Sequence, residues 1–174
     1  MNLQPTLVSP RTLLTPLLPS DQERLYAVAN DPLIWEQHPN PDRWQKPVFQ
    51  LFFEGALQSQ GAFLLLNRKT GEVMGTSRFY GYDPPSSLVF IGYTFLARKF
   101  WGTGINSEIK KVMLDYAFES VSQVHFQIGA NNLRSQIAIE RLGAIKIGEE
   151  VVAYHAEQPK LNFLYKLTSN SLIS

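Results

Sequence analysis

The densest run of apolar residues lies in the middle of the chain, between residues 88 and 97. β-Branched and aromatic side chains from Val89 to Leu96 occupy both alternating positions, which is the pattern of a strand covered on both faces. Apolar residues then recur at spacings of three and four between Ile105 and Glu119, as on one face of an amphipathic helix. The sequence therefore predicts a buried central strand that is followed closely by a helix.

Further elements are predicted on both sides of this pair. Before it, we expect a strand, two helices and a β-hairpin, at 11–17, 20–30, 44–60, 62–66 and 72–80. A capping box from Ser20 to Glu23 is predicted to begin the first helix. After the pair, we expect a strand, a helix and two strands, at 124–128, 133–142, 145–154 and 162–167. This order indicates an α/β (α+β) fold with a mixed, mostly antiparallel sheet and one parallel crossover at its centre.

Composition and charge exclude several kinds of protein. The 174 residues, of which 44% are hydrophobic and 18% charged, fit one globular domain over 1–174. A net charge of +1 gives no electrostatic reason to expect nucleic acid or an anionic membrane as a partner. Because the chain has no cysteine and only three histidines, we expect no disulfide, no cysteine nucleophile and no metal site. No signal peptide or membrane span is evident, so we expect a cytoplasmic protein.

The segment between the central strand and its helix contains two glycines, Gly102 and Gly104. Glycine allows a tight turn that presents successive N–H groups at the positive end of a helix dipole, which is a seat for an anion. A plain tight turn is the alternative reading of these glycines. A Rossmann site is disfavoured because Glu119 ends the helix and no acid ends the next strand. A phosphate-binding NTPase loop is excluded, since no Gly-Lys-Ser/Thr follows.

Several motifs resemble one known family. They are Ile91-Gly-Tyr-Thr-Phe95, Lys99-Phe-Trp-Gly-Thr-Gly104, Asn106-Ser-Glu108, Asn132-Leu-Arg-Ser135 and Glu140-Arg-Leu-Gly-Ala144. Together, and in this order, they resemble the GCN5-related N-acetyltransferases (GNAT), and within them the RimJ/RimL-like branch that acetylates ribosomal-protein N-termini. The resemblance covers essentially the whole chain. It implies the GNAT acyl-CoA N-acyltransferase fold, with a central parallel pair of strands splayed apart and about four helices around the sheet.

The resemblance also implies acetyl-CoA as cosubstrate, with an amine as acceptor. In the family, loop amides hold the cofactor pyrophosphate, and strand groups left unpaired by the splay bond the pantetheine arm. Carried over to this chain, the cofactor-binding residues are Phe95, Leu96, Ala97, Lys99, Phe100, Trp101, Gly102, Thr103, Gly104, Ile105, Asn106, Asn132 and Ser135. Lys99 stands where the family usually has glutamine or arginine, which keeps the charge of arginine without its planar fork.

The catalytic assignments rest on the same resemblance. Ser135 falls where the ribosomal-protein branch has a serine beside the coenzyme sulfur, placed to protonate the leaving thiolate. Other branches use a tyrosine at the position of Ile139, which makes Ser135 the candidate here. Its alternative role is to cap a helix. Phe90 stands where many relatives have a glutamate, so Glu150 and Tyr93 are reserve candidates for the general base.

The acceptor is defined only by its class. In the family the first helical region borders the acceptor pocket, so Trp35, His38 and Trp44 are candidate substrate-binding residues, with hydrophobic packing as the alternative. His125 and His155 are expected to have local structural roles. Without an evident base, the chain favours an α-amine over a lysine side chain, whose deprotonation near neutral pH costs roughly 3.5 kcal/mol more.

The sequence leads to two hypotheses about function. The first is an N-acetyltransferase acting on a protein or peptide N-terminus or a small amine by direct attack in a ternary complex. The second is a non-catalytic acetyl-CoA-binding sensor or interaction protein. We expect the chain to be a monomer or a homodimer.

Overall fold

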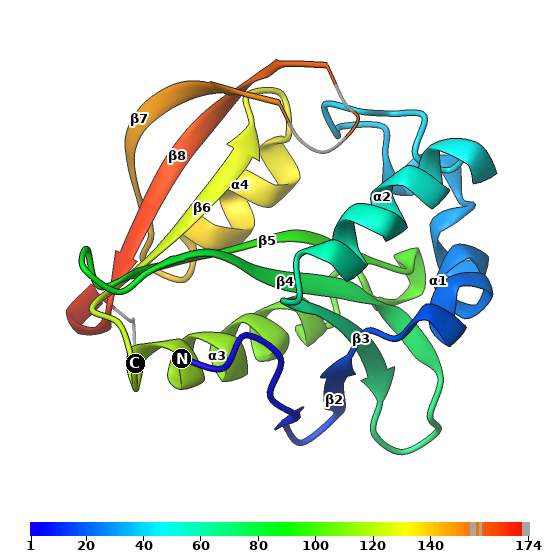
Figure 1. Ribbon diagram of the computed structural model, residues 1–174, viewed down its shortest axis with the longest axis horizontal. Helices are drawn as coiled ribbons and strands as arrows, with labels where there is room; N and C mark the ends of the chain where they lie inside the picture. Colours follow the sequence, from blue (N-terminus) through cyan, green and yellow to red (C-terminus); the bar gives the residue numbers. More distant parts are fainter. Residues whose placement is uncertain (154–155, 157, 172–174) are drawn as a thin grey trace.

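The fold is built on one β-sheet. The computed structural model describes residues 1–153, 156 and 158–171. Within these residues the sheet has eight strands in the order β1-β2-β3-β4-β5-β6-β8-β7 (Figure 1). Their bounds are Leu7–Val8 (β1), Thr12–Pro16 (β2), Ala62–Asn67 (β3), Val73–Asp83 (β4), Leu88–Leu96 (β5), Gln123–Gly129 (β6), Ile145–Val152 (β7) and Lys160–Thr168 (β8). Only β5 and β6 pair in parallel, which confirms the predicted mixed sheet and central crossover.

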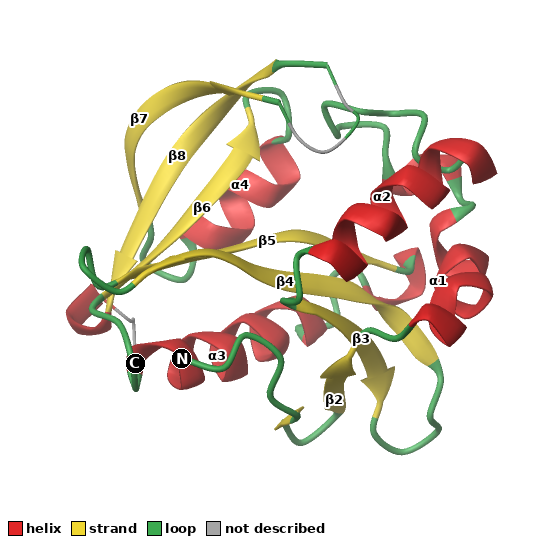
Figure 2. Ribbon diagram, viewed as in Figure 1, coloured by secondary structure: helices red, strands yellow, loops and turns green. Residues whose placement is uncertain are grey.

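Four α-helices pack against this sheet (Figure 2). Their bounds are Gln22–Ala29 (α1), Lys46–Gln58 (α2), Ile105–Phe118 (α3) and Leu133–Glu140 (α4). Buried side chains along β3 alternate between two hydrophobic clusters, which shows which face each helix covers. Phe63 and Leu65 belong to the cluster that contains α3, whereas Leu64 belongs to the cluster that contains α1 and α2. Because successive strand residues point to opposite faces, the two helix pairs cover opposite faces of the sheet.

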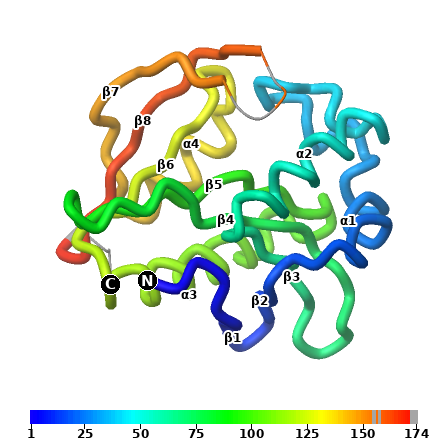
Figure 3. Tube along the Cα trace, viewed as in Figure 1, coloured from blue at the N-terminus to red at the C-terminus, as the bar shows by residue number. Residues whose placement is uncertain are grey.

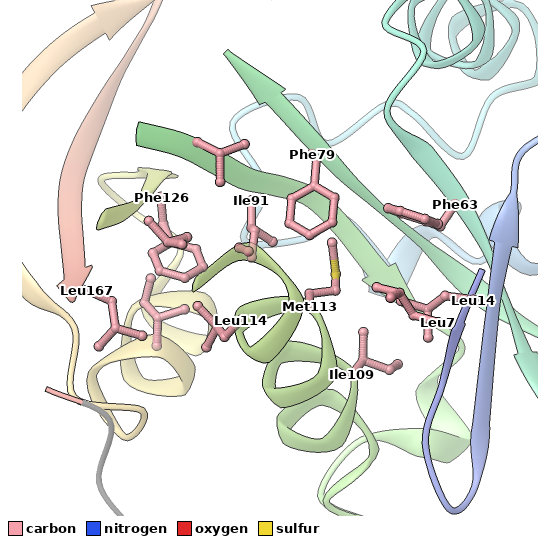
Figure 4. Close-up of a cluster of buried hydrophobic side chains, with 14 of the residues drawn as sticks. Leu7, Leu14, Phe63, Phe79, Ile91, Ile109, Met113, Leu114, Phe126 and Leu167 are labelled. Carbon is pink, nitrogen blue, oxygen red and sulfur yellow. The ribbon is translucent and has the colours of Figure 1, made fainter. Parts of the chain in front are cut away.

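The cluster on the α3 face is the larger core. Met113 and Leu114 of α3 point toward Phe79 and Ile91 of the sheet, and Ile109 lies near Leu14 (Figure 4). All of these side chains are at most 1% exposed. This is the amphipathic face that the sequence predicted. Burying side chains of this size stabilises the fold by roughly 1.5–3 kcal/mol each.

Three contacts join the N-terminal segment to α3. The first residues run alongside this helix (Figure 3), and the Tyr116 hydroxyl donates to the carbonyl of Asn2 (2.9 Å). Near the other end of α3, the Arg11 guanidinium donates to the Glu108 carboxylate (2.6 Å). Burial and the hydrogen bonds from Ser9 and Arg11 oppose one another at Glu108, and the net result is a lowered pKa. The start of α3 is therefore held in place by the first strands.

The central parallel pair is short, and its strands then separate. β5 and β6 pair only over Leu88–Phe90 and Gln123–His125, and beyond these residues the two strands diverge in Figure 1. A β-bulge adds to the separation: Tyr93 and Thr94 of β5 both lie opposite Ser77 of β4. Tyr93 has φ +52°, a left-handed conformation that is uncommon outside glycine. The expected splay is thus confirmed, and the bulge adjoins it.

Some predicted details of the local structure are wrong. Ser20 and Glu23 do not form the capping box, because a short 3₁₀ helix, Pro19–Asp21, precedes α1. Instead, the Asp21 carboxylate accepts from the Leu18 N–H (3.0 Å). Strand β1 was not predicted, and its two residues are too few for a period-2 pattern. The predicted end of β7 at Tyr154, and His155, lie outside the described residues.

Candidate active site

A cavity of about 600 Å³ opens where β5 and β6 diverge. Residues from β4, β5, β6, α3, α4 and the segment between α1 and α2 line it. Twelve of the residues singled out from the sequence are among them: Trp35, His38, Tyr93, Phe95, Leu96, Phe100, Trp101, Gly102, Gly104, Asn106, Asn132 and Ser135. Residues separated by a hundred positions in the chain thus meet at one site.

One wall of the cavity is the start of α3. Gly102 (φ +71°) and Gly104 (φ +82°) are left-handed, a conformation that glycine adopts without strain. Gly104 is the N-cap residue, and no side chain bonds the first-turn amides. These amides lack intrahelical acceptors and lie at the positive end of the helix dipole. Gly104 and Asn106 line the cavity, so this wall has the geometry of an anion site.

Hydrogen bonds fix the loop that precedes α3. The Trp101 indole N–H donates to the carbonyl of Leu96 (3.0 Å), and the Arg11 guanidinium donates to the carbonyl of Thr103 (3.1 Å). The Thr103 hydroxyl donates to the carbonyl of Phe100 (2.7 Å). Thr103 and Ile105 do not line the cavity, and the Ile105 side chain is buried in the core. Any contribution of these two residues to a ligand is therefore through the backbone.

Lys99 and Ala97 also lie outside the cavity lining. The Lys99 ammonium pairs with the Glu72 carboxylate and lies over the Phe100 ring. Its side chain is 59% exposed. The Ala97 N–H donates to the carbonyl of Met74 (2.8 Å) and closes the β4–β5 ladder. The positive charge of Lys99, which the sequence assigned to phosphate binding, is thus paired with the Glu72 carboxylate.

Other basic side chains line the cavity. Arg134 and Arg141, on and just after α4, line it together with Arg43 and Lys110. No aspartate or glutamate is among the described residues that line it. The cavity is therefore positive although the whole chain carries a net charge of only +1. Sequence reasoning missed all four, because isolated basic residues give no local signal until the fold brings them together.

The start of α4 forms a second wall. The Asn132 side chain accepts from the Ser135 N–H (3.2 Å), which caps the helix. Ser135 lies in this first turn, and Ile139 lies one turn further along the same face; both line the cavity. Asn132, not Ser135, is thus the capping residue, and Ser135 lines the cavity.

The bulge in β5 supplies the floor. The Tyr93 ring stacks under the Arg78 guanidinium (3.8 Å to the ring centroid) and packs against Tyr80 (5.2 Å between centroids). The Tyr80 hydroxyl donates to the Gln127 side-chain oxygen (3.1 Å), which links β4 to β6 across the diverging strands. Tyr80 and Gln127 line the cavity and were not predicted. For Gln127 the only signal in the sequence was the polar alternation of β6.

Lys110 is a further residue that sequence reasoning missed. It is 4% exposed and lines the cavity one helical turn after Asn106. Its ammonium donates to the Thr94 hydroxyl (2.5 Å) and to the Ser77 hydroxyl (3.3 Å). Burial lowers the pKa of Lys110 to about 7. The helical spacing from Asn106 was the one available clue.

The segment between α1 and α2 closes the site on the other face. The Trp35 indole N–H donates to the carbonyl of Ala29 (2.8 Å), and its ring packs on Phe95 (4.9 Å). The His38 ring lies edge-on to Trp35 and bonds Arg43 (3.1 Å). Burial, and then the charge of Arg43, hold the pKa of His38 well below its usual range. Trp35 and His38 thus line the cavity as predicted for an acceptor wall.

The remaining candidates lie elsewhere. Trp44 is 38% exposed and does not line the cavity. Glu150 lies on β7 opposite Asn162 and is also absent from the lining. His125 packs edge-on against Phe90 (5.5 Å), and burial together with Lys166 lowers its pKa. Among the described residues, no group of three or more His, Cys, Asp or Glu side chains can hold a metal ion.

The splayed sheet, with a cavity lined by cationic side chains and by the start of a helix, defines a class of α/β fold. Comparison with known proteins gives the family: the chain belongs to the GNAT acetyltransferase family, whose domain model, described as acetyltransferase (GNAT) domain, matches residues 11–145. This confirms the resemblance found in the sequence.

Individual relatives agree with this family. The chain is 28% identical over 103 residues to an uncharacterized N-acetyltransferase, p20, of Bacillus licheniformis, covering 59% of this chain and 53% of that protein. The match thus spans about half the length of that curated relative. A GCN5-related N-acetyltransferase from Brucella melitensis has the same fold, with a TM-score of 0.79, 16% identity and coverage of 97% and 80% of the two chains. So does ribosomal-protein-S5-alanine acetyltransferase from Vibrio fischeri, with a TM-score of 0.67, 17% identity and coverage of 98% and 100%.

Proposed function

We propose that this chain transfers an acetyl group from acetyl-CoA to a primary amine. The observation that carries this proposal is the positive cavity between the splayed strands, which includes the uncapped start of α3. A volume of about 600 Å³ lies within the range of cofactor pockets, roughly 300–1,000 Å³. The lining therefore fits a long, polyanionic cofactor whose diphosphate needs backbone amides and whose arm needs apolar walls.

Each wall has a role in this proposal. Amides near Gly104 and Asn106 would hold the diphosphate, and Arg134 and Arg141 would supply cationic partners. Backbone groups at the Tyr93 bulge would bond the pantetheine arm and the thioester carbonyl. Acetyl-CoA supplies an activated acyl group, so no metal is required for the proposal.

Transfer then needs two proton movements. The amine must lose a proton as it attacks, and the sulfur must gain one as it leaves. The Ser135 hydroxyl, in the first turn of α4, is the candidate donor to the sulfur. Tyr93 lines the cavity and remains a candidate for assisting the amine, whereas Glu150 is outside the lining.

The acceptor enters past Trp35 and His38 in this proposal. Both are held by hydrogen bonds, so the wall is preformed. The Vibrio fischeri structure is named as an acetyltransferase of ribosomal protein S5 alanine. By analogy with that name, we infer that the acceptor of this chain is an α-amine, such as a protein N-terminus or a small amino compound, encountered in the cytoplasm.

One observation favours a second candidate function, a CoA-binding sensor. Phe90 stacks on Tyr80 (5.1 Å between centroids) where many relatives have a glutamate, and no carboxylate lines the described part of the cavity. A site without a base could bind the cofactor and not turn over.

Incubation with acetyl-CoA and a panel of peptides, polyamines and amino compounds distinguishes the two. The proposal predicts release of free CoA that depends on the acceptor and falls in Ser135→Ala. Tight acetyl-CoA binding without release of CoA for any acceptor would favour the sensor. Neither binding nor release would reject both.

A further inference from the structure

Lys110 is a basic side chain that folding places inside the protein without an acidic partner. It lies on α3 in the cavity wall and is 4% exposed. No ion pair joins it to a carboxylate within the described residues, whereas its neighbour Lys111 is exposed and pairs with Asp115 (3.4 Å). Burying a lysine in this way is unfavourable, so its position calls for an explanation beyond packing.

The amine instead belongs to a cluster with two hydroxyls. Its Nζ lies 2.5 Å from the Thr94 hydroxyl and 3.3 Å from the Ser77 hydroxyl, and these two oxygens are 2.8 Å apart. Thr94 belongs to the β5 bulge and lines the cavity; Ser77 is the β4 residue opposite that bulge. The cluster therefore adjoins the point where the sheet opens, and both Thr94 and Lys110 line the cavity.

We propose that Lys110 accepts, through the Thr94 hydroxyl, the proton that the acceptor amine loses during acyl transfer. This inference rests on the proposed function. The nitrogen–carbon bond forms and the carbon–sulfur bond of the thioester breaks. One proton passes from the attacking nitrogen to Thr94 Oγ1, and the hydroxyl proton of Thr94 passes to Nζ. The sulfur leaves as a thiolate and takes a proton from Ser135, which regains one from water. Lys110 returns its proton to solvent after the product leaves.

The charges around the cluster agree with this role. The charged and titratable groups on the surrounding elements are Arg78 on β4, Tyr93 on β5, His125 on β6, Glu108 on α3, Arg134 and Arg141 at α4, and Arg43 and His38 across the cavity. None of them shifts the pKa of Lys110, which burial alone lowers to about 7. An amine of that pKa is partly neutral near pH 7 and can take up a proton there.

The same cluster supplies a basic group at the cavity, which neither Phe90 nor Glu150 does. Phe90 has no basic atom, and Glu150 is absent from the described cavity lining. A neutral lysine that takes the proton of a neighbouring hydroxyl is established chemistry in serine–lysine hydrolases. Here the hydroxyl would transmit a proton and would not attack the substrate itself.

A direct titration tests whether the Lys110 amine loses its proton near neutral pH. Protein labelled with ¹³C at lysine Cε is titrated by NMR, with and without CoA, and Lys110→Met assigns the resonance. We expect Lys110 to titrate near pH 7. A Lys110 resonance that titrates above pH 10 would overturn the proposal, because the ammonium could not then act as a base near neutrality.

Kinetics with matched variants test whether Thr94 and Lys110 carry the proton during acetyl transfer. The acceptor is a weakly basic amine that stays neutral above pH 6, so its own ionisation does not shape the profile. We expect Lys110→Met to lower kcat/KM by about a hundredfold or more and to remove the rise in kcat/KM near pH 7. Lys110→Arg, whose side chain stays protonated, should not restore activity, and Thr94→Val should be as impaired as Lys110→Met. Thr94→Ser should retain most activity, and the double variant should lose no more than either single one.

Further measurements separate proton transfer by Lys110 from effects on folding or binding. Lys111→Met should behave as the wild type, and the acetyl-CoA affinity of Lys110→Met should stay within about threefold, which separates proton transfer from folding or binding. A wild-type pH profile in Lys110→Met would overturn this inference and leave the proposed function standing. Acetylation of Lys110 itself in intact-mass spectra would also overturn it, since the amine would then be an acceptor. If the wild type transfers acetyl groups to no amine, both proposals fail.

Discussion

The Arg134 guanidinium lies 3.9 Å from the centroid of the Trp101 ring. This contact joins the loop before α3 to the first turn of α4, the two walls proposed to hold the cofactor. Arg134 also donates to the carbonyl of Ile34 (3.3 Å), and its backbone N–H donates to the Gln37 side chain (3.1 Å). One arginine thus connects the cofactor walls to the segment that forms the acceptor wall.

We expect Arg134→Met to weaken acetyl-CoA binding by about tenfold, because a cation–π contact and a charge facing the cavity are both lost. Trp101→Leu should have a similar effect. Since each variant breaks the same contact, the double variant should lose less than the sum of the two free energies. Titration calorimetry measures this, with Arg24→Met as a control at an exposed site paired with Asp21. Fully additive losses would show that the stacking does not organise the site.

Gly104 should serve both the fold and the ligand. Its φ of +82° strains any L-residue, and an added Cβ would lie 3.4 Å from the Arg11 guanidinium. We expect Gly104→Val to lower the free energy of unfolding by about 1–2 kcal/mol or more as well as acetyl-CoA affinity. Gly104→Asn tolerates the left-handed conformation better, so it should retain most of the stability. Thermal unfolding and calorimetry on the two variants separate strain from ligand contact; equal melting temperatures would contradict the strain argument.

Lys110 should make stability depend on pH in an unusual direction. Its pKa is about 7 in the fold and about 10.4 in the unfolded chain. Between these values the unfolded state binds more protons, so stability rises with pH over this range. Below pH 7 the full cost of the shift, roughly 5 kcal/mol, is present. We expect Lys110→Met to raise the melting temperature most at pH 6 and least near pH 10.

Lys111→Met is the matched control for that experiment. Its side chain is 71% exposed, so the change should shift the melting temperature little at any pH. A gain in Lys110→Met that is the same at pH 6 and pH 10 would show that packing, not ionisation, is responsible.

His38 should contribute an acid limb to the stability profile, that is, a loss of folding stability as the pH falls. Its pKa is held well below 6.5 by burial and by Arg43, so below pH 6.5 the unfolded state binds the additional proton. Stability is therefore lost as pH falls below about 6.5. We expect His38→Gln to flatten this limb between pH 5 and 6.5 in chemical denaturation. We expect His125→Gln to flatten it less, because the pKa of His125 is lowered less than that of His38. An unchanged limb in both variants would contradict this account.

The sequence was sufficient to predict the order of the longer elements and the turn between β5 and α3. Periodicity identified β5 and α3, and the two glycines between them identified the turn, because these signals are local. The bulge at Tyr93 was not predictable, since it depends on the register between β4 and β5. The Lys110 cluster was missed for a similar reason: it joins residues 33 and 16 positions apart along the chain.

Two candidate residues lie outside the cavity lining for physical reasons. Lys99 was assigned to the cofactor loop by resemblance, and its ammonium pairs with Glu72 of the neighbouring hairpin. Trp44 was grouped with Trp35 because, in the family, this region borders the acceptor pocket. Trp35 is only 2% exposed and bonds Ala29, whereas Trp44 lies where its carbonyl accepts from Tyr26 at the surface. Side-chain direction in an irregular segment is set by tertiary contacts that no local pattern encodes.

The most direct test of the central claim is an NMR titration of the backbone amides with CoA. If the start of α3 binds the diphosphate, the amides of residues 102–106 should shift most, followed by those of the bulge at 93–96. The amides of β1 and α1 should be unaffected. Saturable CoA binding that shifts only amides far from the cavity, or no binding at all, would contradict the account.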